Sequence, residues 1–416
     1  MTTPPAPNFA DLIFHRLSEE AAHADVGCTI GVALHLEGPV PKPSKLRADV
    51  AARIGALPCL THTLSGRPPK WAPAYPDLER HIGEHRLSES PGALEEAIQE
   101  LLREPLPADA PPWRLMVLHG HAPGASVLLY LTHHAVQDGG SVVAVLETLF
   151  GPPLLPSQHS TTARMPRIRV RQAYRSIAPI IRSARPHGFW DSESHPLSTG
   201  RRLMWAEVPV ASLRAAARLG KCSANDAYLT ALAHAIAGWA AEHWPGAADA
   251  PLPVIVPVNL RTPEEAVLPG NRCFAVRVDL PGGPSPLAER LDGVVQATTL
   301  LKSVSHRAVL HKITDLVPTW LMRRIGLRGL RPGCLSIGCS FLFLRHRLEY
   351  GGARAVRVAP VMFCPEGTPL TVSLAWYGQL ATVCFRIDAA LPGGDTIPAR
   401  WRRAVEELST PVGEAV

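Results

Sequence analysis

The chain has 416 residues, of which 46% are hydrophobic and 19% are charged, so it can bury large cores and is not globally disordered. Its formal net charge of +6 is small for this length and does not by itself indicate a nucleic-acid-binding protein. The eight cysteines form no C-x-x-C pair, which favours buried, reduced thiols over a disulfide framework or a zinc site.

The opening sequence, MTTPPAPNFADLIFHRL, lacks the basic region and following apolar run that mark a secretory signal peptide. No window approaches the roughly 18 uninterrupted apolar residues that indicate a transmembrane helix. We therefore expect a cytoplasmic protein.

Strands and helices alternate in the first part of the chain. The hydrophobic pattern predicts strands over 29–36, 113–119 and 126–132, and helices over 44–54, 93–103 and 141–150. This alternation is typical of a layered α/β subdomain, which we place at residues 1–160.

A stretch rich in Pro, Ser and Arg, residues 151–200, follows this subdomain. No acidic residue occurs from Thr148 to Trp190, whereas arginines stand at positions 164, 167, 169, 171, 175, 182 and 185. A solvated basic linker over 161–200 explains the pattern. The alternative is a surface that meets an acidic carrier protein, CoA phosphates or an anionic lipid.

The C-terminal subdomain, residues 201–416, again mixes both element types. We expect strands over 202–208, 254–260, 274–280, 335–344, 355–361, 369–376 and 380–387, and helices over 211–219, 225–239 and 397–408, with a long amphipathic region over 285–330. Strands closing the second part indicate a second layered α/β subdomain.

The motif LTHHAVQDGGS (131–141) is the strongest candidate site. Adjacent histidines at a strand end point to opposite faces, so His133 and His134 are poorly placed to bind one metal ion. Asp138 can cap the helix that follows. A histidine leaving the sheet can also serve as a general base, because a neutral imidazole accepts a proton near pH 7. These residues alone leave the cap and the base open, and no G-x-S-x-G motif supplies a nucleophilic serine.

HHAVQDG (133–139) resembles HHxxxDG, the signature shared by peptide-synthetase condensation domains and bacterial wax ester synthase/diacylglycerol acyltransferases. Four more segments resemble the second family in the expected order, namely PKWAPAYPDLERHIGEHRL (69–87), EPLPADAPPWRLMVLHG (104–120), KCSANDAYLTALAHAIAGW (221–239) and PVNLRTPEEAVLPGNRCFAVRVDLP (257–281). The chain departs from the family at PPW, which replaces PLW, and at CLSIGCSFLF (334–343), which lacks the family's Asn and Pro-Gly.

The resemblance implies a chloramphenicol acetyltransferase-like α/β fold with two similar subdomains, mixed sheets and an active-site tunnel between them. It implies that His134 is the general base and that His133 packs or orients the loop. Asp138 is then structural and pairs with Arg261, while Gly139 leaves space for close approach. The remaining supporting positions are Asn225, Asp226 and Asn271, of which the first two are equally explained as a helix cap.

The implied activity is acyl transfer from acyl-CoA or a carrier-bound thioester to an alcohol. The alternatives are a freestanding condensation enzyme that forms an amide or ester from a carrier-bound acyl group, and a silent scaffold. No cofactor and no metal are expected, because the thioester is the substrate. The stretch LVPTWLMRRIGLRGLR (316–331) is amphipathic and basic, so peripheral membrane contact is a further partner hypothesis.

Overall fold

The computed structural model describes residues 4–21, 27–152, 170–191, 197–331, 333–334 and 336–410. The chain divides into two compact units, and neither is one continuous stretch. Unit 1 contains Met1–Thr162, Arg261–Cys273 and Leu342–Pro365, and unit 2 contains Ala163–Leu260, Phe274–Phe341 and Glu366–Val416.

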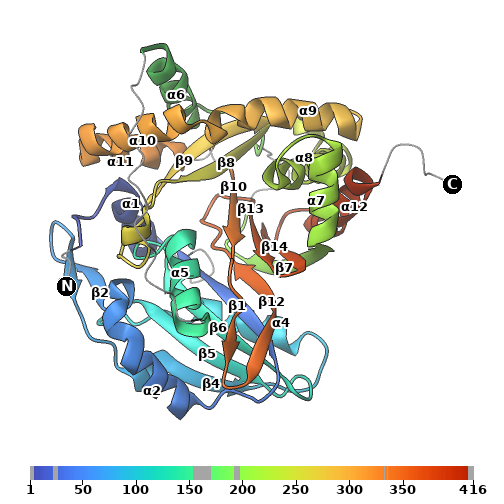
Figure 1. Ribbon diagram of the computed structural model, residues 1–416. Coiled ribbons are helices and arrows are strands. Elements are labelled where there is room, and N and C mark those ends of the chain that lie inside the picture. The colour runs from blue at the N-terminus through green and yellow to red at the C-terminus, as the bar shows by residue number, and fades with distance from the viewer. Residues whose placement is uncertain are drawn as a thin grey trace. The chain divides into compact units, whose positions relative to one another are not determined.

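Unit 1 is built on a six-stranded mixed sheet with the strand order β11-β12-β1-β6-β5-β4 (Figure 1). Its strands are β1 (Thr29–Glu37), β4 (Ile82–Arg86), β5 (Trp113–His119), β6 (Ala125–His133), β11 (Glu349–Tyr350) and β12 (Ala353–Val361). Neighbouring strands are antiparallel except β4 and β5, which run parallel. The central strands β1 and β6 are almost entirely buried, so β6 carries the end of the histidine motif out of a rigid core.

Four of the five helices described in unit 1 begin at a side-chain N-cap or a proline, and the fourth in chain order begins after Gly92 without one. The five are α1 (Phe9–Glu20), α2 (Pro43–Arg53), α3 (Leu78–His81), α4 (Ala93–Arg103) and α5 (Gly139–Phe150). A short hairpin of β2 (His62–Ser65) and β3 (Lys70–Pro73) completes the unit. Asn8 caps α1 through a capping box with Asp11, and Asp138 caps α5.

Strand β12 reaches unit 1 from far along the sequence. It lies antiparallel to β1, with Ala33 opposite Ala359, and so covers an edge of β1 that would otherwise be unpaired. Its residues fall within the range 201–416 that we assigned to the C-terminal subdomain. Segment 261–273, in the same range, also belongs to unit 1. Unit 1 therefore receives two segments from the second half of the chain.

Unit 2 contains a second six-stranded mixed sheet, with the order β7-β14-β13-β10-β8-β9. Its strands are β7 (Arg201–Pro209), β8 (Leu252–Asn259), β9 (Cys273–Leu280), β10 (Ile337–Phe343), β13 (Leu370–Tyr377) and β14 (Leu380–Asp388). Helices α7 (Val210–Leu219), α8 (Ala224–His243) and α12 (Ile397–Ser409) pack on this sheet around Trp239, Phe385 and Trp401.

The amphipathic region 285–330 is three helices rather than one. They are α9 (Leu287–Thr298), α10 (Val304–Leu316) and α11 (Thr319–Gly329), and Pro318 immediately precedes the third. The 161–200 segment also contains a helix, α6 (Val170–Ser183), which the composition did not indicate. None of the described helices is long and apolar enough to cross a membrane.

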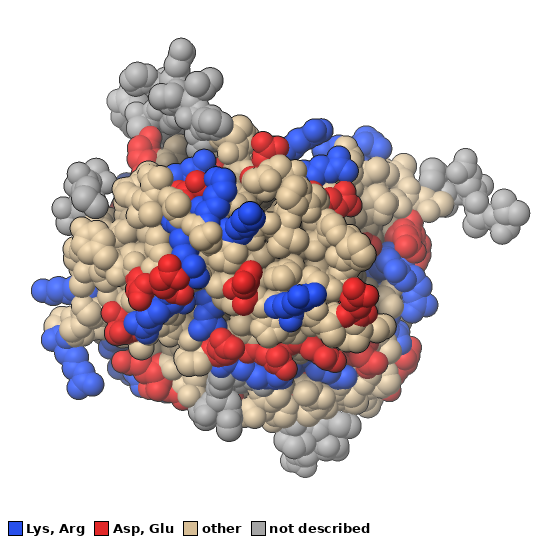
Figure 2. Space-filling model, turned by 90° about the horizontal axis from the view of Figure 1, so that it is seen from below, with Lys and Arg blue, Asp and Glu red and all other residues tan. Residues whose placement is uncertain are grey.

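Acidic and basic side chains are interspersed on the face of the molecule shown in Figure 2. Blue and red residues lie next to one another there, with apolar and neutral surface between them.

Candidate active site

The HHAVQDG segment forms the turn that joins β6 to α5. The N–H groups of Val136 and Gln137 both donate to the carbonyl of His133, at 2.9 and 3.2 Å, and so close the turn. Segment 261–273 contacts the turn directly, because the Gly270 N–H donates to the Val136 carbonyl at 2.6 Å. Residues distant in sequence therefore hold this turn in place.

His133 is engaged within its own turn. Its Nδ1 accepts a hydrogen bond from the Ala135 N–H at 3.0 Å, so the neutral ring carries its proton on Nε2. Burial, with the nearby His134 and His15, lowers the pKa of His133 to about 4. The neutral ring therefore offers no free basic nitrogen to a substrate.

His134 is half-buried between two aromatic rings. Its imidazole stacks on Phe14, with the ring centroids 4.0 Å apart and the planes 13° apart. Phe363 meets the same imidazole edge-on, at 5.1 Å and 88°. The Nδ1 atom is buried and has no hydrogen-bond partner within the described parts of the chain. Ring packing, rather than a carboxylate, therefore fixes the direction of this imidazole.

The pKa of His134 lies below its usual value. Burial is the main cause, since it disfavours the imidazolium, and it outweighs the opposing effects of nearby backbone groups, Asp138 and Asn271. The ring is therefore neutral at pH 7, which is the state a general base requires.

Asp138 is buried and fully occupied by structural contacts. Its Oδ1 accepts the Ser141 N–H at 2.9 Å, which caps α5, and its Oδ2 accepts the Arg272 N–H at 2.7 Å. Arg261 Nη2 lies 3.0 Å from the same Oδ2, so the ion pair expected from the resemblance is present. Burial alone would raise the pKa of Asp138, but Arg261 and the two N–H donors outweigh it and lower the pKa. The helix-cap interpretation and the ion-pair interpretation are thus both correct.

Arg261 connects Asp138 to the main chain of its own segment. Its Nη1 donates to the carbonyls of Glu265 and Leu268, and its Nη2 donates to the carbonyl of Gly270. A guanidinium suits this position because it offers several donors in one plane. Arg261 therefore stabilises both the turn and the segment that contacts it.

Glycine at position 139 is explained by a neighbouring side chain that needs the space, and not by an unusual backbone conformation. A Cβ on Gly139 would lie 2.6 Å from Cδ2 of Leu342, within the same unit. Its φ lies outside the left-handed region. The residue that approaches Gly139 closely, as the sequence predicted, is therefore Leu342.

Asn271 joins the histidine turn to helix α1. Its Nδ2 donates to the carbonyl of His134 at 2.8 Å and to Asp11 Oδ1 at 2.9 Å. Its main-chain N–H donates to the same Asp11 oxygen at 2.7 Å. The amide thereby fixes the backbone at the candidate base.

Comparisons with known proteins indicate the activity of the chain. Residues 8–187 match the model of the wax ester synthase/diacylglycerol acyltransferase catalytic domain. Two proteins named diacylglycerol O-acyltransferase, from Mycobacterium bovis and Mycobacterium tuberculosis, are each 24% identical in an alignment 418 positions long, gaps included, that covers 90% of this chain and 89% of the relative. The chain is an acyltransferase, and it is similar to this group of enzymes.

Solved structures agree on the fold of the acyltransferase. A wax ester synthase/diacylglycerol acyltransferase from Marinobacter aquaeolei matches with a TM-score of 0.63 at 17% identity, covering 98% of each chain. The first condensation domain of the calcium-dependent antibiotic synthetase matches with a TM-score of 0.69 at 16% identity, covering 98% of this chain and 96% of that chain. The expected mixed α/β, chloramphenicol acetyltransferase-like fold is confirmed.

Asn225 and Asp226 of the acyltransferase lie at the start of α8 in unit 2. Ser223 is the N-cap, and Asp226 completes its capping box. Asp226 is buried and also accepts hydrogen bonds from Thr298 Oγ1 at 2.6 Å and Lys302 Nζ at 2.5 Å. The cap interpretation holds for Asp226, whose contacts are structural, while Asn225 is half-buried in the first turn.

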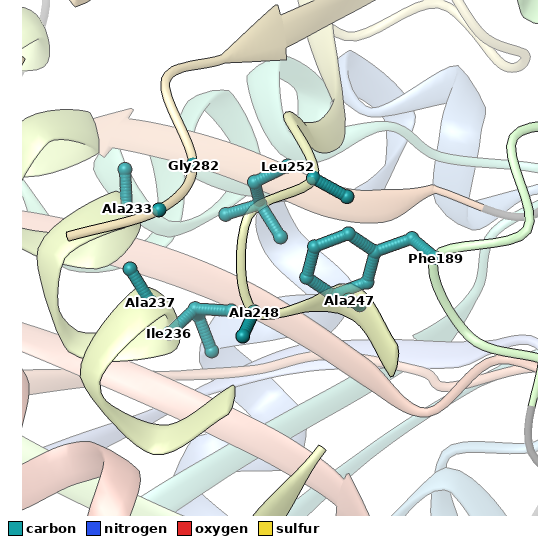
Figure 3. Close-up of a pocket in the computed structure, with 10 residues that line it drawn as sticks. Phe189, Ala233, Ile236, Ala237, Ala247, Ala248, Leu252 and Gly282 are labelled. Carbon is teal, nitrogen blue, oxygen red and sulfur yellow. The ribbon is translucent and has the colours of Figure 1, made fainter. Parts of the chain in front are cut away.

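Two pockets of unit 2 contain none of the predicted site residues. One is too narrow to hold a water molecule, and Figure 3 shows Phe189, Ile236 and Leu252 around it. The other has a volume of about 250 Å³ and is lined by residues of α8 and α12, including His234 and Arg400. Within the described residues, no cluster of three His, Cys, Asp or Glu side chains could hold a metal ion.

The sequence analysis missed three residues that contact this site, namely Asp11, Phe14 and Phe363. A local signal existed for the first, because Asn8-x-x-Asp11 is a capping-box pattern. No local pattern indicates that a phenylalanine will lie against a histidine more than a hundred positions away, as Phe14 and Phe363 both do.

Proposed function

We propose that this acyltransferase moves an acyl group from a thioester, either acyl-CoA or a phosphopantetheinyl thioester, to an alcohol, with His134 as the general base. The observation that carries the proposal is the state of His134. Its ring is neutral at pH 7, is clamped by two phenyl rings, and has its Nδ1 buried, so Nε2 is the nitrogen assigned to the substrate.

In the proposed reaction, Nε2 of His134 takes the proton of the acceptor hydroxyl as its oxygen attacks the thioester carbonyl carbon. The tetrahedral intermediate then collapses, the C–S bond breaks, and the leaving thiolate takes the proton from the imidazolium. The products are an ester and a free thiol, and no other reactant is needed. Orientation and proton transfer are the two contributions that this ring supplies.

Asp138, Arg261, Asn271 and Gly139 have supporting roles in the proposal. The two oxygens of Asp138 are occupied by Ser141, Arg272 and Arg261, so its carboxylate stabilises the turn and does not transfer protons. His133 is assigned a similar structural role, because its Nδ1 is bound to the Ala135 N–H.

The alternative is a freestanding condensation enzyme that forms an amide or ester from a carrier-bound acyl group. The basic segment is relevant to that partner. Arg164, Arg167 and Arg169 lie outside the described residues, whereas Arg171, Arg175, Arg182 and Arg185 are exposed on or just after α6. Such a surface suits an acidic carrier and the phosphates of CoA equally well.

The donor and acceptor are tested together. Purified protein is incubated with the same acyl group on CoA and on a carrier protein, and with matched alcohols and amines, and products are read by mass spectrometry. Diacylglycerol and long-chain alcohols come first, because the relatives are named for such acceptors. We expect ester from the wild type and none from His134→Ala. Wild-type turnover in His134→Ala would contradict the proposed base, and preferential amide formation would favour the alternative.

Peripheral contact with an anionic membrane is a separate proposal about partners. Tyr174, Ile177 and Ile181 of α6 are 76%, 38% and 54% exposed, and their spacing places them on one helical stripe. Exposed arginines flank the stripe, and Trp320 at the start of α11 is 64% exposed. Flotation with phosphatidylglycerol vesicles should recover the wild type and not the variant Tyr174→Ser/Ile181→Ser, and no recovery of the wild type at physiological salt would contradict it. The cytoplasmic location stays a sequence-based prediction.

A further inference from the structure

Helix α1 presents two side chains to the histidine turn from one face. Asp11 and Phe14 are three positions apart, which places them one above the other on a helix. Phe14 contacts the ring of His134, and Asp11 reaches the backbone of His134 through Asn271. Neither residue belongs to the HHAVQDG segment.

The backbone connection runs through one fully buried carboxylate. Asp11 Oδ1 accepts both the N–H and the Nδ2 of Asn271, and Oδ2 accepts the Asn8 N–H at 2.8 Å. Asn271 has a second Nδ2 proton, which it donates to the carbonyl of His134. If the carboxylate is lost, Asn271 loses the acceptor of two of its hydrogen bonds, and its hydrogen bond to His134 loses its support.

The ring connection depends on flat surfaces. Nδ1 of His134 forms no hydrogen bond among the described residues, so the orientation of the ring depends on the groups packed against it. Rotation of the imidazole out of its present plane would press its edge into the face of Phe14, which lies almost parallel to it at 4.0 Å. Phe363 limits movement from the perpendicular direction. Phe14 and Phe363 therefore restrict the imidazole to one plane.

We propose that Asp11 and Phe14 are positioning residues for the acyl-transfer reaction: helix α1 holds His134 through its backbone by Asp11 and Asn271, and through its ring by Phe14. This inference rests on the proposed role of His134. It adds that helix α1, outside the motif, is required for the base to be aimed correctly. Errors of about 1 Å in such placement reduce rates by about 100-fold.

The test uses full-length protein with substitutions on α1. Asp11→Asn keeps the size of the side chain but cannot accept from all three N–H donors, and Phe14→Leu keeps apolar volume but removes the flat face. Phe14→Tyr restores the flat face. Glu20→Gln is the matched control, because it neutralises a carboxylate of the same helix that is 56% exposed and paired with Arg16.

We expect Asp11→Asn and Phe14→Leu to lower kcat for ester formation by about 10- to 100-fold, with KM for the thioester within about twofold of wild type. Phe14→Tyr and Glu20→Gln should retain wild-type kcat within about threefold. Unchanged kcat in both Asp11→Asn and Phe14→Leu, or a change confined to KM, would overturn the inference.

A second readout does not depend on activity. Diethyl pyrocarbonate modifies neutral imidazole nitrogens, and peptide mapping by mass spectrometry gives the rate at His134, with the exposed His85 as an internal reference. A ring released from Phe14 samples more orientations, so we expect modification to be severalfold faster in Phe14→Leu and Asp11→Asn, and unchanged in Glu20→Gln. Equal rates in all variants would overturn the inference. If the wild type transfers no acyl group, the proposed function fails, and the modification rates still decide whether α1 holds the ring.

Discussion

Asp138 and Arg261 form a buried ion pair, with 3.0 Å between Oδ2 and Nη2, although one residue follows β6 and the other follows β8. The side chain of Asp138 is 5% exposed and that of Arg261 is 4% exposed. Arg261 also binds three carbonyls of segment 261–273, so one guanidinium holds two distant stretches of chain together. A charge pair in this setting is costly to break from one side, because the remaining ion stays buried.

Arg261→Ala should therefore destabilise the protein strongly. Removing one partner of a buried pair costs about 3–5 kcal/mol, and here three carbonyls also lose a donor. The measurement is urea unfolding followed by circular dichroism. Arg261→Lys keeps the charge and should lose less, while unchanged unfolding in Arg261→Ala would mean that Asp138 is stabilised by other groups.

The two adjacent histidines should respond differently to the same substitution. Asn at position 133 can still accept the Ala135 N–H through its side-chain oxygen, so His133→Asn should keep ester formation within about fivefold, because the variant retains the turn contact. His134→Asn has no basic nitrogen and should lose about 10²–10⁴-fold in kcat. Comparable losses in both variants would contradict this division of roles.

The pH dependence of the reaction should have its acid limb below pH 6.5. The base must be neutral, and burial lowers the pKa of His134 below its ordinary value. Activity should therefore fall as pH decreases through that lowered pKa and stay level from there to neutral pH. The measurement is kcat/KM across pH 4.5–8 with a saturating co-substrate. An acid limb centred above pH 7 would be inconsistent with a buried, unpaired imidazole.

Sequence reasoning succeeded for features encoded by neighbouring residues. The cap of α5 by Asp138 was predictable, because cap and helix adjoin in sequence, and the buried strands β5 and β6 follow from unbroken apolar runs. The family resemblance supplied Arg261, whose pairing with Asp138 no local pattern indicates. The placement of β12 beside β1 was not predictable, because a single sequence does not reveal which strands pair across a long separation.

Helix α1 illustrates the same limit at the candidate site. Its sequence, FADLIFHRLSEE, shows one ordinary capping box, and Asp11 is a typical member of such a box. Asp11 is distinguished by its complete burial and by the two hydrogen bonds that it accepts from Asn271. Asn271 is 260 positions away in the sequence. Those contacts exist only in the folded chain.

Asp11 should make stability depend on pH between about 4 and 6. Burial raises the pKa of Asp11 to about 6, against the opposing effects of hydrogen bonds from Asn271 and Asn8 and the charge of Arg272. The folded chain thus binds this proton more tightly than the unfolded chain, whose Asp pKa is about 3.9, so the contribution of Asp11 to stability falls as pH rises through this window and is constant above it.

The size of this effect is at most about 3 kcal/mol, from about 1.4 kcal/mol per pKa unit. Asp11→Asn cannot titrate, so its constant loss of hydrogen bonds cancels when one compares pH values. As pH rises from 4 to 6.5, the unfolding free energy of the wild type should therefore decrease relative to that of Asp11→Asn. A difference that is independent of pH would show that Asp11 has an ordinary pKa in the folded protein.

Gly139 and Leu342 should be energetically coupled. A Cβ at position 139 would lie 2.6 Å from Cδ2 of Leu342, and that atom is the end of a flexible side chain, so Gly139→Ala forces a local shift rather than unfolding. Overpacking of this kind costs about 1–3 kcal/mol, partly offset by up to about 1 kcal/mol from the better helix propensity of alanine in α5. Leu342→Ala removes the clashing atom.

Gly139→Ala should therefore be less costly, or stabilising, in the Leu342→Ala background, as measured by a double-mutant cycle in urea. Strictly additive effects would mean that the space beside Gly139 is filled by something other than Leu342.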